Sequence, residues 1–361
     1  MKFLDLFAGV GGFRFGMEAA GHECVGFVEI DKYARKSYEA IHNTKGEWTA
    51  HDITSVTDDD IRGLRDRGPI DIICGGFPCQ AFSVAGKRKG FDDTRGTLFF
   101  EIARFANIIR PQYLFLENVK GLLNHDGGIT FEVILRTLDE LGYDAEWQVL
   151  NSKDFGVPQN RERVFIIGHL RGRSTRKVFP IRGTSSEANS IDIIAHRKGY
   201  RRNTQVFNPT GITETLDTGQ GGGRGHYTVS KVGNVNPSGN GMNGQVYSCD
   251  GLSPTLTTNK GEGLKIVQPV LTPDRAEKRQ NGRRFKNDGE PMFTLTAQDR
   301  HGFYDGNRIR KLTPRECWRL QSYPDWAFDK AAAVNSDSQL YKQAGNGVTA
   351  NVIEAIAEKL V

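Results

Sequence analysis

The sequence predicts an α/β fold in which a mostly parallel sheet with helices on both faces is followed by a smaller domain of short strands and loops. Over residues 1–170, short apolar runs alternate with amphipathic runs of helix length, which is the pattern of strands connected through helices. After residue 170 this periodicity fades, and 17 of the 42 glycines fall between Asn203 and Arg310. A glycine-rich region without helical periodicity is typical of short strands joined by loops.

The first part of the chain contains six strand signals and three helix signals. Strands are expected at residues 3–7, 23–28, 71–74, 113–116, 145–150 and 163–169, and helices at residues 32–41, 97–109 and 130–141. A loop with Gly156, Val157 and Pro158 and no helical pattern joins the last two strands. We expect these two strands to pair antiparallel, because parallel neighbours need a longer crossover.

Regular structure is expected to resume near Thr313. Here Thr313, Pro314 and Glu316 supply an N-cap, a proline at the first helical position and a glutamate at the third, which together favour a helix start. Residues 348–360 repeat apolar side chains at helical spacing. We expect this last helix to pack back on the first domain, so that residues 308–361 complete it.

Composition narrows the class of protein. A chain of 361 residues with 37% hydrophobic and 25% charged residues is long enough for two domains and a substantial core. Its five cysteines are an odd number without a Cys-x-x-Cys pair, so neither a disulfide framework nor a zinc site is supported, and a reducing, cytoplasmic setting is expected. No window approaches the roughly 20 apolar residues of a membrane span and no charged leader is seen, so no membrane association is expected.

Charge is distributed unevenly along the chain. The net charge is +5, but residues 171–312 hold 23 Lys and Arg against 12 Asp and Glu, a net charge of +11 that leaves −6 on the remainder. A basic segment on a mildly acidic body is what binding to a phosphate backbone requires. A well-solvated surface region accounts for the same charges equally well.

The basic region also contains a weak internal repeat. Residues 214–218, 254–258 and 293–297 share a Thr-Leu core at spacings of 40 and 39 residues. Each copy is followed by glycine and a polar or charged cluster, which indicates a recurring unit of strand plus loop. Chance similarity in a threonine-rich region is the alternative.

A candidate reactive thiol, Cys79, lies in the run Gly-Gly-Phe-Pro-Cys-Gln-Ala-Phe-Ser at residues 75–83. The run follows an apolar strand, and loops beyond the carboxyl ends of strands commonly carry chemistry. The glycines permit a sharp turn, and Pro78 fixes φ beside the thiol. Taken alone, however, Cys79 also fits a small core residue.

A glycine-rich turn at residues 5–13, with the sequence Asp-Leu-Phe-Ala-Gly-Val-Gly-Gly-Phe, lies between a strand and a helix and is typical of a loop that cradles a nucleotide-like ligand. It has neither the G-x-G-x-x-G pattern nor the Lys and Ser/Thr of a phosphate loop, which disfavours hydride and phosphoryl transfer. Glu29 closes the second strand, where a carboxylate can accept from ribose hydroxyls. Asp52, near the end of the expected third strand, is placed to accept from an adenine amino group. Either carboxylate alone fits a solvated surface, but together they favour an adenosine ligand.

Three further charged groups are expected on the ligand-binding side. Glu117 directly follows a strand that should lie beside the Cys79 loop, and a semi-buried glutamate can keep a raised pKa and donate a proton. Arg161 and Arg163 are two residues apart, so on an extended backbone they point to one side, where they can grip phosphate or a base edge; a surface strand with Arg-Glu pairs is the alternative. The basic, glycine-bracketed residues 87–96 suit a loop that closes on nucleic acid.

In this order, the motifs resemble the DNA cytosine-5 methyltransferases of bacteria and phages. The matching positions are residues 5–13, Glu29, Asp52, 75–83, 96–101, 117–119, 159–163, 310–324 and 343–348. The resemblance implies a Rossmann-like, S-adenosylmethionine-dependent methyltransferase sheet in a catalytic and cofactor-binding domain of residues 1–170, completed by residues 308–361. Residues 171–307 lack family landmarks and correspond to the variable DNA target-recognition domain.

The resemblance also implies a reaction. The family transfers a methyl group from S-adenosyl-L-methionine to carbon 5 of a cytosine in a short duplex recognition sequence, leaving S-adenosyl-L-homocysteine. Cys79 corresponds to the nucleophile that adds to carbon 6, Glu117 to the proton donor at ring nitrogen 3, and Arg161 and Arg163 to side chains that hold the flipped nucleotide. Carbon 6 is inaccessible in a stacked duplex, so the base must swing out.

Further residues are implied by their match to the family. The positions that surround the cofactor are Phe7, Ala8, Gly9, Gly11, Gly12, Glu29, Ile30, Asp52, Ile53, Gly76, Pro78, Leu98, Asn346 and Val348. The expected DNA contacts are Gln80, Ser83, Lys87, Arg88, Lys89, Arg95 and Arg224, and no metal site is expected.

The expected partner is double-stranded DNA, bound by a monomer in the bacterial or phage-infected cytoplasm, close to the nucleoid. Two alternatives stay open: a cognate restriction endonuclease that acts separately, or a solitary enzyme without one. Two other functions compete with this interpretation. A methyltransferase of the same fold acting on transfer RNA needs a shorter, differently charged insert after Arg163, and a catalytically silent DNA- or nucleotide-binding protein has no need of Cys79, Glu117 and Arg163 together.

Overall fold

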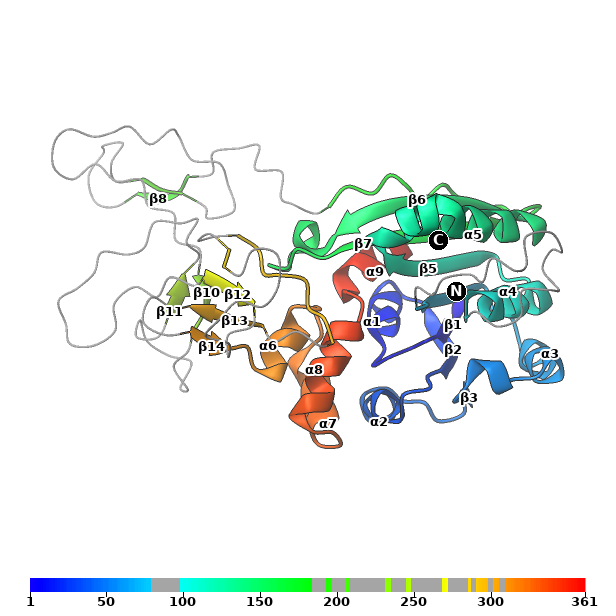
Figure 1. Ribbon diagram of the computed structural model, residues 1–361, viewed down its shortest axis with the longest axis horizontal. Coiled ribbons are helices and arrows are strands. Elements are labelled where there is room, and N and C mark those ends of the chain that lie inside the picture. The colour runs from blue at the N-terminus through cyan, green and yellow to red at the C-terminus, as the bar shows by residue number, and fades with distance from the viewer. Residues whose placement is uncertain are drawn as a thin grey trace. The chain divides into compact units, whose positions relative to one another are not determined.

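The computed structural model divides into two compact units (Figure 1). It describes residues 1–78, 98–183, 193–196, 205–207, 231–234, 245–247, 268–271, 285–286, 290–297, 301–304 and 309–360. The first unit comprises Met1–Gly183, Leu295–Gln298 and Thr313–Val361, and the second comprises Thr184–Thr294 and Asp299–Leu312. The chain therefore stays in the first unit beyond residue 170, and it enters that unit again for four residues from within the second.

The first unit is built on a seven-stranded sheet in the order β3-β2-β1-β4-β5-β7-β6. Its strands are β1 (Lys2–Leu6), β2 (Glu23–Val28), β3 (Trp48–Ala50), β4 (Ile72–Gly76), β5 (Tyr113–Val119), β6 (Tyr143–Asn151) and β7 (Glu162–Leu170). The neighbours from β3 to β5 are parallel, whereas β7 is antiparallel to both β5 and β6. The α/β fold class and the antiparallel final pair are confirmed.

The first unit also contains nine helices among its described residues. They are α1 (Gly12–Ala19), α2 (Lys32–Ile41), α3 (Asp58–Asp66), α4 (Leu98–Ile109), α5 (Ile129–Glu140), α6 (Pro314–Arg319), α7 (Asp325–Ala332), α8 (Asp337–Asn346) and α9 (Ala350–Ala357), with short 3₁₀ turns η1 (Ile53–Ser55), η4 (Lys120–Gly128) and η5 (Ser152–Phe155). The predicted helix start at Thr313 is confirmed by a capping box in which the side chains and backbones of Thr313 and Glu316 bond reciprocally. None of the helices among the described residues is long and apolar enough to cross a bilayer.

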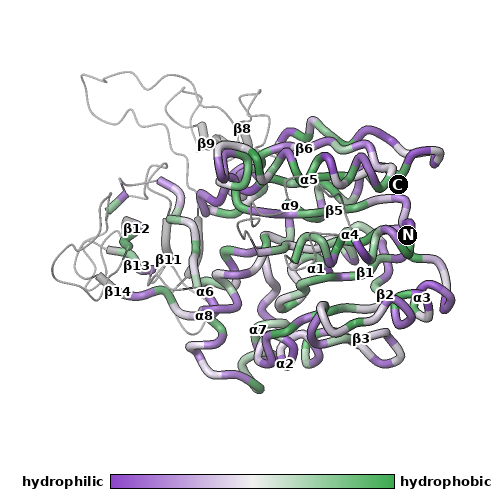
Figure 2. The backbone as a smooth tube through the Cα atoms, turned by 45° about the vertical axis from the view of Figure 1, so that its right-hand side comes forward, coloured by the Kyte–Doolittle hydropathy of each residue, from purple (hydrophilic) through white to green (hydrophobic). Residues whose placement is uncertain are grey.

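The central strands are buried on both sides, and alternate side chains enter two cores. Leu4, Ile73 and Leu114 point into a core with α3, α4 and α5, while Phe3 and Phe115 point into a core with α1 and α9 on the other face. Apolar stretches follow these strands in the hydropathy-coloured tube (Figure 2). The sheet is thereby fixed from both faces, and its strand ends have fixed positions.

The C-terminal helix packs directly on the first helix, as expected. An added Cβ at Gly16 of α1 would lie 2.6 Å from both the carbonyl oxygen of Ala350 and the Cβ of Ile353 in α9. Only glycine permits so close an approach of the two backbones. The last element of the chain is therefore part of the first unit.

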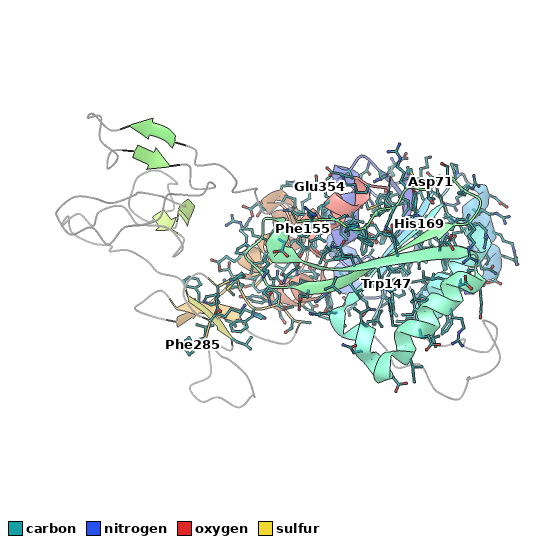
Figure 3. All side chains as sticks on the ribbon, turned by 90° about the horizontal axis from the view of Figure 1, so that it is seen from above. Asp71, Trp147, Phe155, His169, Phe285 and Glu354 are labelled. Atoms are coloured by element: carbon teal, nitrogen blue, oxygen red, sulfur yellow. The ribbon has the colours of Figure 1, made fainter. Side chains whose placement is uncertain are left out.

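Strand β6 forms one edge of the sheet, and its Trp147 is 44% exposed (Figure 3). Side chains of β6 bind the stretch of chain that follows β7. Glu146 accepts from the N–H groups of Val178 and Phe179, and Gln148 both accepts from the N–H and donates to the carbonyl of Ile181. These bonds fix the chain before it enters the second unit.

The second unit has short antiparallel strands. They are β8 (Ile193–His196) with β9 (Gln205–Phe207), β10 (Lys231–Asn234) with β11 (Gln245–Tyr247), and β12 (Gln268–Leu271), β13 (His301–Tyr304) and β14 (Ile309–Lys311) in one sheet. The repeat copies at residues 214–218 and 254–258 lie outside the described residues. The third copy, at residues 293–297, is described and runs from the second unit into the first.

Candidate active site

A cavity of about 540 Å³ lies in the first unit, at the carboxyl ends of the parallel strands, where open α/β sheets bind their ligands. Most of the site residues predicted from the sequence line it. They are Phe7, Gly9, Glu29, Ile30, Asp52, Ile53, Gly76, Pro78, Leu98, Glu117, Arg161, Arg163 and Asn346.

A second cavity, of about 590 Å³, lies at the opposite edge of the sheet, where β1 and β2 begin. Arg14 lines it and donates to both carboxylate oxygens of Glu47, at 2.9 and 2.8 Å. Arg14 and Glu47 are thus paired with each other, and none of the described site residues predicted from the sequence lines this cavity. The candidate site is therefore the cavity at the carboxyl ends.

Glu29 is held between the glycine-rich turn and the start of α2. The N–H groups of Gly9 and Asp31 donate to its two carboxylate oxygens, each at 2.7 Å. Burial raises the pKa of Glu29, and these two hydrogen bonds oppose the rise. Glu29 lines the cavity, and each carboxylate oxygen keeps a further lone pair, so the carboxylate can still accept from ligand hydroxyls.

Two cavity residues beside Glu29 contribute contrasting surfaces. Ile30 is 69% exposed and offers an apolar side chain to the cavity. Asp52 is half-buried, and its Oδ1 accepts from both the hydroxyl and the N–H of Thr54, at 2.7 and 2.9 Å, which lowers the pKa of Asp52. An apolar face beside a permanently charged acceptor suits an aromatic base with an exocyclic amino group.

An ion pair that the sequence did not reveal crosses the cavity rim. Lys342 of α8 donates to Asp31 at 2.6 Å, and both residues line the cavity. Asp31 also caps α2 by accepting from the N–H of Tyr33 at 2.8 Å. Although burial opposes it, the hydrogen bond from Lys342, with those from the helix N–H groups, lowers the pKa of Asp31. The two partners are 311 residues apart in the sequence, so no local pattern links them.

Strand β4 leads toward the predicted nucleophile, and the structure describes the chain as far as Pro78. An added Cβ at Gly75 would lie 2.1 Å from the carbonyl oxygen of Leu6, and one at Gly76 would lie 2.8 Å from Oε2 of Glu117. The side chain of Asn118 donates to the carbonyl oxygen of Phe77 at 2.8 Å. The glycine pair therefore allows close approach to β1 and to Glu117, and Asn118 fixes the backbone just before the cysteine.

The predicted nucleophile and the predicted DNA contacts lie beyond that point. Cys79, Gln80, Ser83, Lys87, Arg88, Lys89, Arg95 and Arg224 are outside the described residues.

Glu117 is a buried carboxyl group in contact with a cation. It lies in β5, and its Oε1 is 3.0 Å from Nε of Arg163, which begins the neighbouring β7. Only 12% of the Glu117 side chain and 15% of the Arg163 side chain are exposed. Burial raises the pKa of Glu117 above its ordinary value, and the nearby charges of Arg163 and Arg161 oppose the rise. A carboxyl group with this balance can hold a proton closer to neutral pH than a free glutamate.

The structure shows what holds Arg161 in place. The residue is 2% exposed, and its guanidinium donates to three backbone carbonyls, those of Leu295, Gly345 and Gly347. Arg161 also borders the cavity, and its contact with a flipped nucleotide stays a prediction. Of the two predicted arginines, only Arg163 has its charged group paired with Glu117.

Four predicted cofactor positions do not line the cavity, because they serve close packing. An added Cβ at Gly11 would lie 2.2 Å from Nε2 of His42, and one at Gly12 would lie 2.6 Å from the hydroxyl of Tyr323. Val348 is buried in the core with α1 and α9, and Ala8 packs with Phe27 and Tyr38. These residues shape the turn and its support.

The sequence of the whole chain, residues 1–361, matches the family described as C-5 cytosine-specific DNA methylase. The chain belongs to the C-5 cytosine-specific DNA methylases. As a methylase of this family it is an enzyme that methylates cytosine in DNA.

Relatives and solved structures agree with the family of the methylase. The orphan methyltransferase M.SPRI of Bacillus phage SPR is 41% identical, over 100% of this chain and 97% of that protein. The type II methyltransferase M.HhaI of Haemophilus parahaemolyticus is 35% identical, over 99% and 93%. A mutant of DNMT2 from Spodoptera frugiperda shares the fold, with a TM-score of 0.54 at 17% identity over 99% of both chains.

Sequence reasoning missed several residues that shape the site of this methylase. Asp31, Asn118, Leu295 and Lys342 act through bonds to distant backbone or side-chain groups. Asn118 and Lys342 lie in or next to runs that carried the resemblance, but nothing in a run states its partner. In the described part of the methylase, no cluster of three His, Cys, Asp or Glu side chains is arranged to hold a metal ion.

Proposed function

We propose that the methylase modifies carbon 5 of a flipped cytosine in duplex DNA through a transient covalent bond between Cys79 and carbon 6. The observation that carries the proposal is the position of Glu117. It is a buried carboxyl group beside Arg163, and an added Cβ at Gly76, three residues before Cys79, would lie 2.8 Å from its Oε2. Proton donor and thiol then act on one base from adjacent strand ends.

The proposed chemistry divides between these residues. As a thiolate, Cys79 adds to carbon 6 while Glu117 protonates ring nitrogen 3, which makes carbon 5 nucleophilic. Arg163 keeps Glu117 oriented and carries a positive charge toward the bound base. After methyl transfer, loss of the carbon-5 proton expels the thiolate and frees the base.

The residues of the cavity fit S-adenosyl-L-methionine as the cofactor. The remaining lone pairs of Glu29 suit ribose hydroxyls, Ile30 suits the face of an adenine, and Asp52 suits its amino group. When bound, this cofactor supplies the electrophilic methyl group and is released as S-adenosyl-L-homocysteine. Phe7, Gly9, Leu98 and Asn346 complete the proposed contacts.

We propose that the second unit recognises the DNA target, whereas the first unit carries out catalysis. Its support is an excess of basic residues: Thr184–Thr294 and Asp299–Leu312 hold 18 Lys and Arg against 12 Asp and Glu, a net charge of +6, which suits a phosphate backbone. The enzyme acts as a monomer in the bacterial or phage-infected cytoplasm near the nucleoid. A separate cognate endonuclease is consistent with the type II relatives, whereas the orphan relatives fit a solitary enzyme.

Transfer of tritiated methyl groups from S-adenosyl-L-methionine tests the proposal. Incorporation is expected into duplex DNA and not into transfer RNA, and bisulfite sequencing of DNA from cells expressing the chain is expected to show one or more short methylated contexts. No incorporation into any duplex DNA would overturn the proposal. Incorporation into transfer RNA alone would favour the RNA-modifying alternative.

A further inference from the structure

A short piece of the third Thr-Leu repeat belongs to the first unit. The chain leaves the second unit after Thr294, runs through the first unit for Leu295–Gln298, and returns to the second at Asp299. Leu295, the leucine of the repeat, is 2% exposed. Residues 295–297, here called the 295–297 segment, are thus built into the first unit although the chain on both sides belongs to the second.

The backbone of Leu295 is bound on both sides by residues that precede β7. Its N–H donates to Oε1 of Gln159 at 3.1 Å, and its carbonyl accepts from Nη1 of Arg161 at 2.8 Å. Gln159 is fully buried, and its amide also donates to the carbonyl of Leu320 at 2.7 Å. Buried bonds of this kind are costly to break, because the polar groups left behind cannot reach water.

The same arginine holds the wall of the cofactor cavity. Nη2 of Arg161 donates to the carbonyls of Gly345 and Gly347, at 3.1 and 2.6 Å, and both glycines line the cavity. An added Cβ at Gly345 would lie 2.3 Å from the carbonyl carbon of Thr296. The 295–297 segment therefore packs directly on the backbone of the cavity wall and also supplies one of the three carbonyls that satisfy Arg161.

Arg161 depends strongly on these carbonyls. Burial, and then the neighbouring charge of Arg163, lowers its pKa to about 9, and its Nε has no hydrogen-bond partner among the described residues. A buried cation that loses one of few acceptors must move or take in water. Because the charge of Arg161 also acts on Glu117, such a movement reaches the proton donor.

We propose that the 295–297 segment is a positioning element of the first unit, which holds Arg161, and with it Glu117 and the cavity wall from Gly345 to Gly347, in the geometry for methyl transfer. The proposal rests on the function proposed above for Glu117. It assigns Gln159, Arg161 and Leu295 to positioning, and it gives one copy of the repeat a task other than contact with DNA.

A pair of matched glutamine variants tests this proposal. Gln159→Met removes the acceptor of the Leu295 N–H. The control, Gln148→Met, removes the two hydrogen bonds that the Gln148 side chain makes with the backbone of Ile181. Gln148 and Ile181 are far in sequence from the cavity wall at Gly345 and Gly347. We measure kcat, KM for S-adenosyl-L-methionine, equilibrium DNA affinity and Tm for both full-length variants. A purely structural role lowers Tm and leaves the kcat of the folded protein unchanged, whereas a positioning role lowers kcat while DNA affinity is kept.

The expected result is a fall in kcat of about tenfold or more for Gln159→Met, with DNA affinity within about twofold of wild type, because small misplacements near reacting groups are costly. Gln148→Met is expected to keep most of its kcat. Equal kcat values for the two variants, or a loss in Gln159→Met that lies entirely in DNA affinity, would overturn the positioning role.

A second variant and the activity of the wild-type protein complete the test. If Gln159→Met does not fold, Leu295→Ala removes the buried side chain that anchors the 295–297 segment, while Gln159 and Arg161 stay intact, and the same comparison with Gln148→Met applies. If wild-type protein methylates no DNA, the proposed function itself has failed. An active wild type with unchanged kcat in Gln159→Met or Leu295→Ala refutes the positioning role alone.

Discussion

At the scale of single residues, two buried carboxyl groups of the first unit have different partners and different roles. Glu117 contacts Arg163, and burial raises its pKa. Asp5, at the end of β1, is fully buried and accepts from the hydroxyl of Tyr38 at 3.4 Å, while its other oxygen has no partner among the described residues. The first group serves the reaction proposed here, whereas the second affects stability.

Replacement of Glu117 by Gln is expected to lower the rate of methyl transfer by about 10²- to 10⁴-fold, because the side chain can no longer give up a proton. Single-turnover kinetics with duplex DNA measure this change. Glu162→Gln, at an exposed neighbouring carboxylate paired with Lys120, serves as the control and is expected to keep the rate. In wild type, activity should fall as pH rises through the raised pKa of Glu117, since the acid form is then lost.

Replacement of Asp5 by Asn is expected to raise stability most at alkaline pH. Burial raises the pKa of Asp5 to about 8 in the folded protein, while the unfolded chain ionises near its ordinary value of 3.8. Between these values the folded state holds the extra proton, so wild-type stability falls as pH rises. Tm measured at pH 5 and pH 8 should therefore decline less in Asp5→Asn than in wild type. An equal decline in both proteins would remove Asp5 from this role, and exposed Asp66→Asn is the control.

At the scale of elements, the contact between α1 and α9 closes the first unit. Gly16→Ala places a methyl group 2.6 Å from the Ala350 carbonyl and is expected to cost about 1–3 kcal/mol of the free energy of unfolding. Gly63→Ala in α3 meets nothing within 4 Å and should stabilise by up to about 1 kcal/mol, since alanine favours helix. Denaturant unfolding of both variants measures the difference. A neutral Gly16→Ala would contradict the close approach.

Elements with a strong apolar period were predictable from the sequence. The range predicted for α2 matches its bounds, and β5 was found although it runs three residues further, to Val119. In contrast, α3 buries only Ile61 and Leu64, so its apolar stripe is too thin to stand out, and α8 is mostly polar. Its position depends on contacts such as Lys342 with Asp31, which local propensity does not express.

At the scale of the whole molecule, the site is assembled by bonds between distant parts of the chain. Arg161 binds Leu295 across 134 residues and Gly347 across 186 residues. The motif containing Arg161 was visible in the sequence, but the three carbonyls that bind its guanidinium were not. Residue types at strand ends could be predicted, because topology gathers those ends. The bonds that orient them depend on long-range packing.

The central claim is that Cys79 forms a covalent bond with the target cytosine, and trapping on DNA that contains 5-fluorocytosine tests it most directly. Fluorine at carbon 5 cannot leave as a proton does, so the thiol adduct should persist. With S-adenosyl-L-methionine present, wild-type protein is expected to form a complex with the modified duplex that survives denaturing electrophoresis, and Cys79→Ser is expected to form none. A denaturation-resistant complex of equal yield with Cys79→Ser would contradict the account.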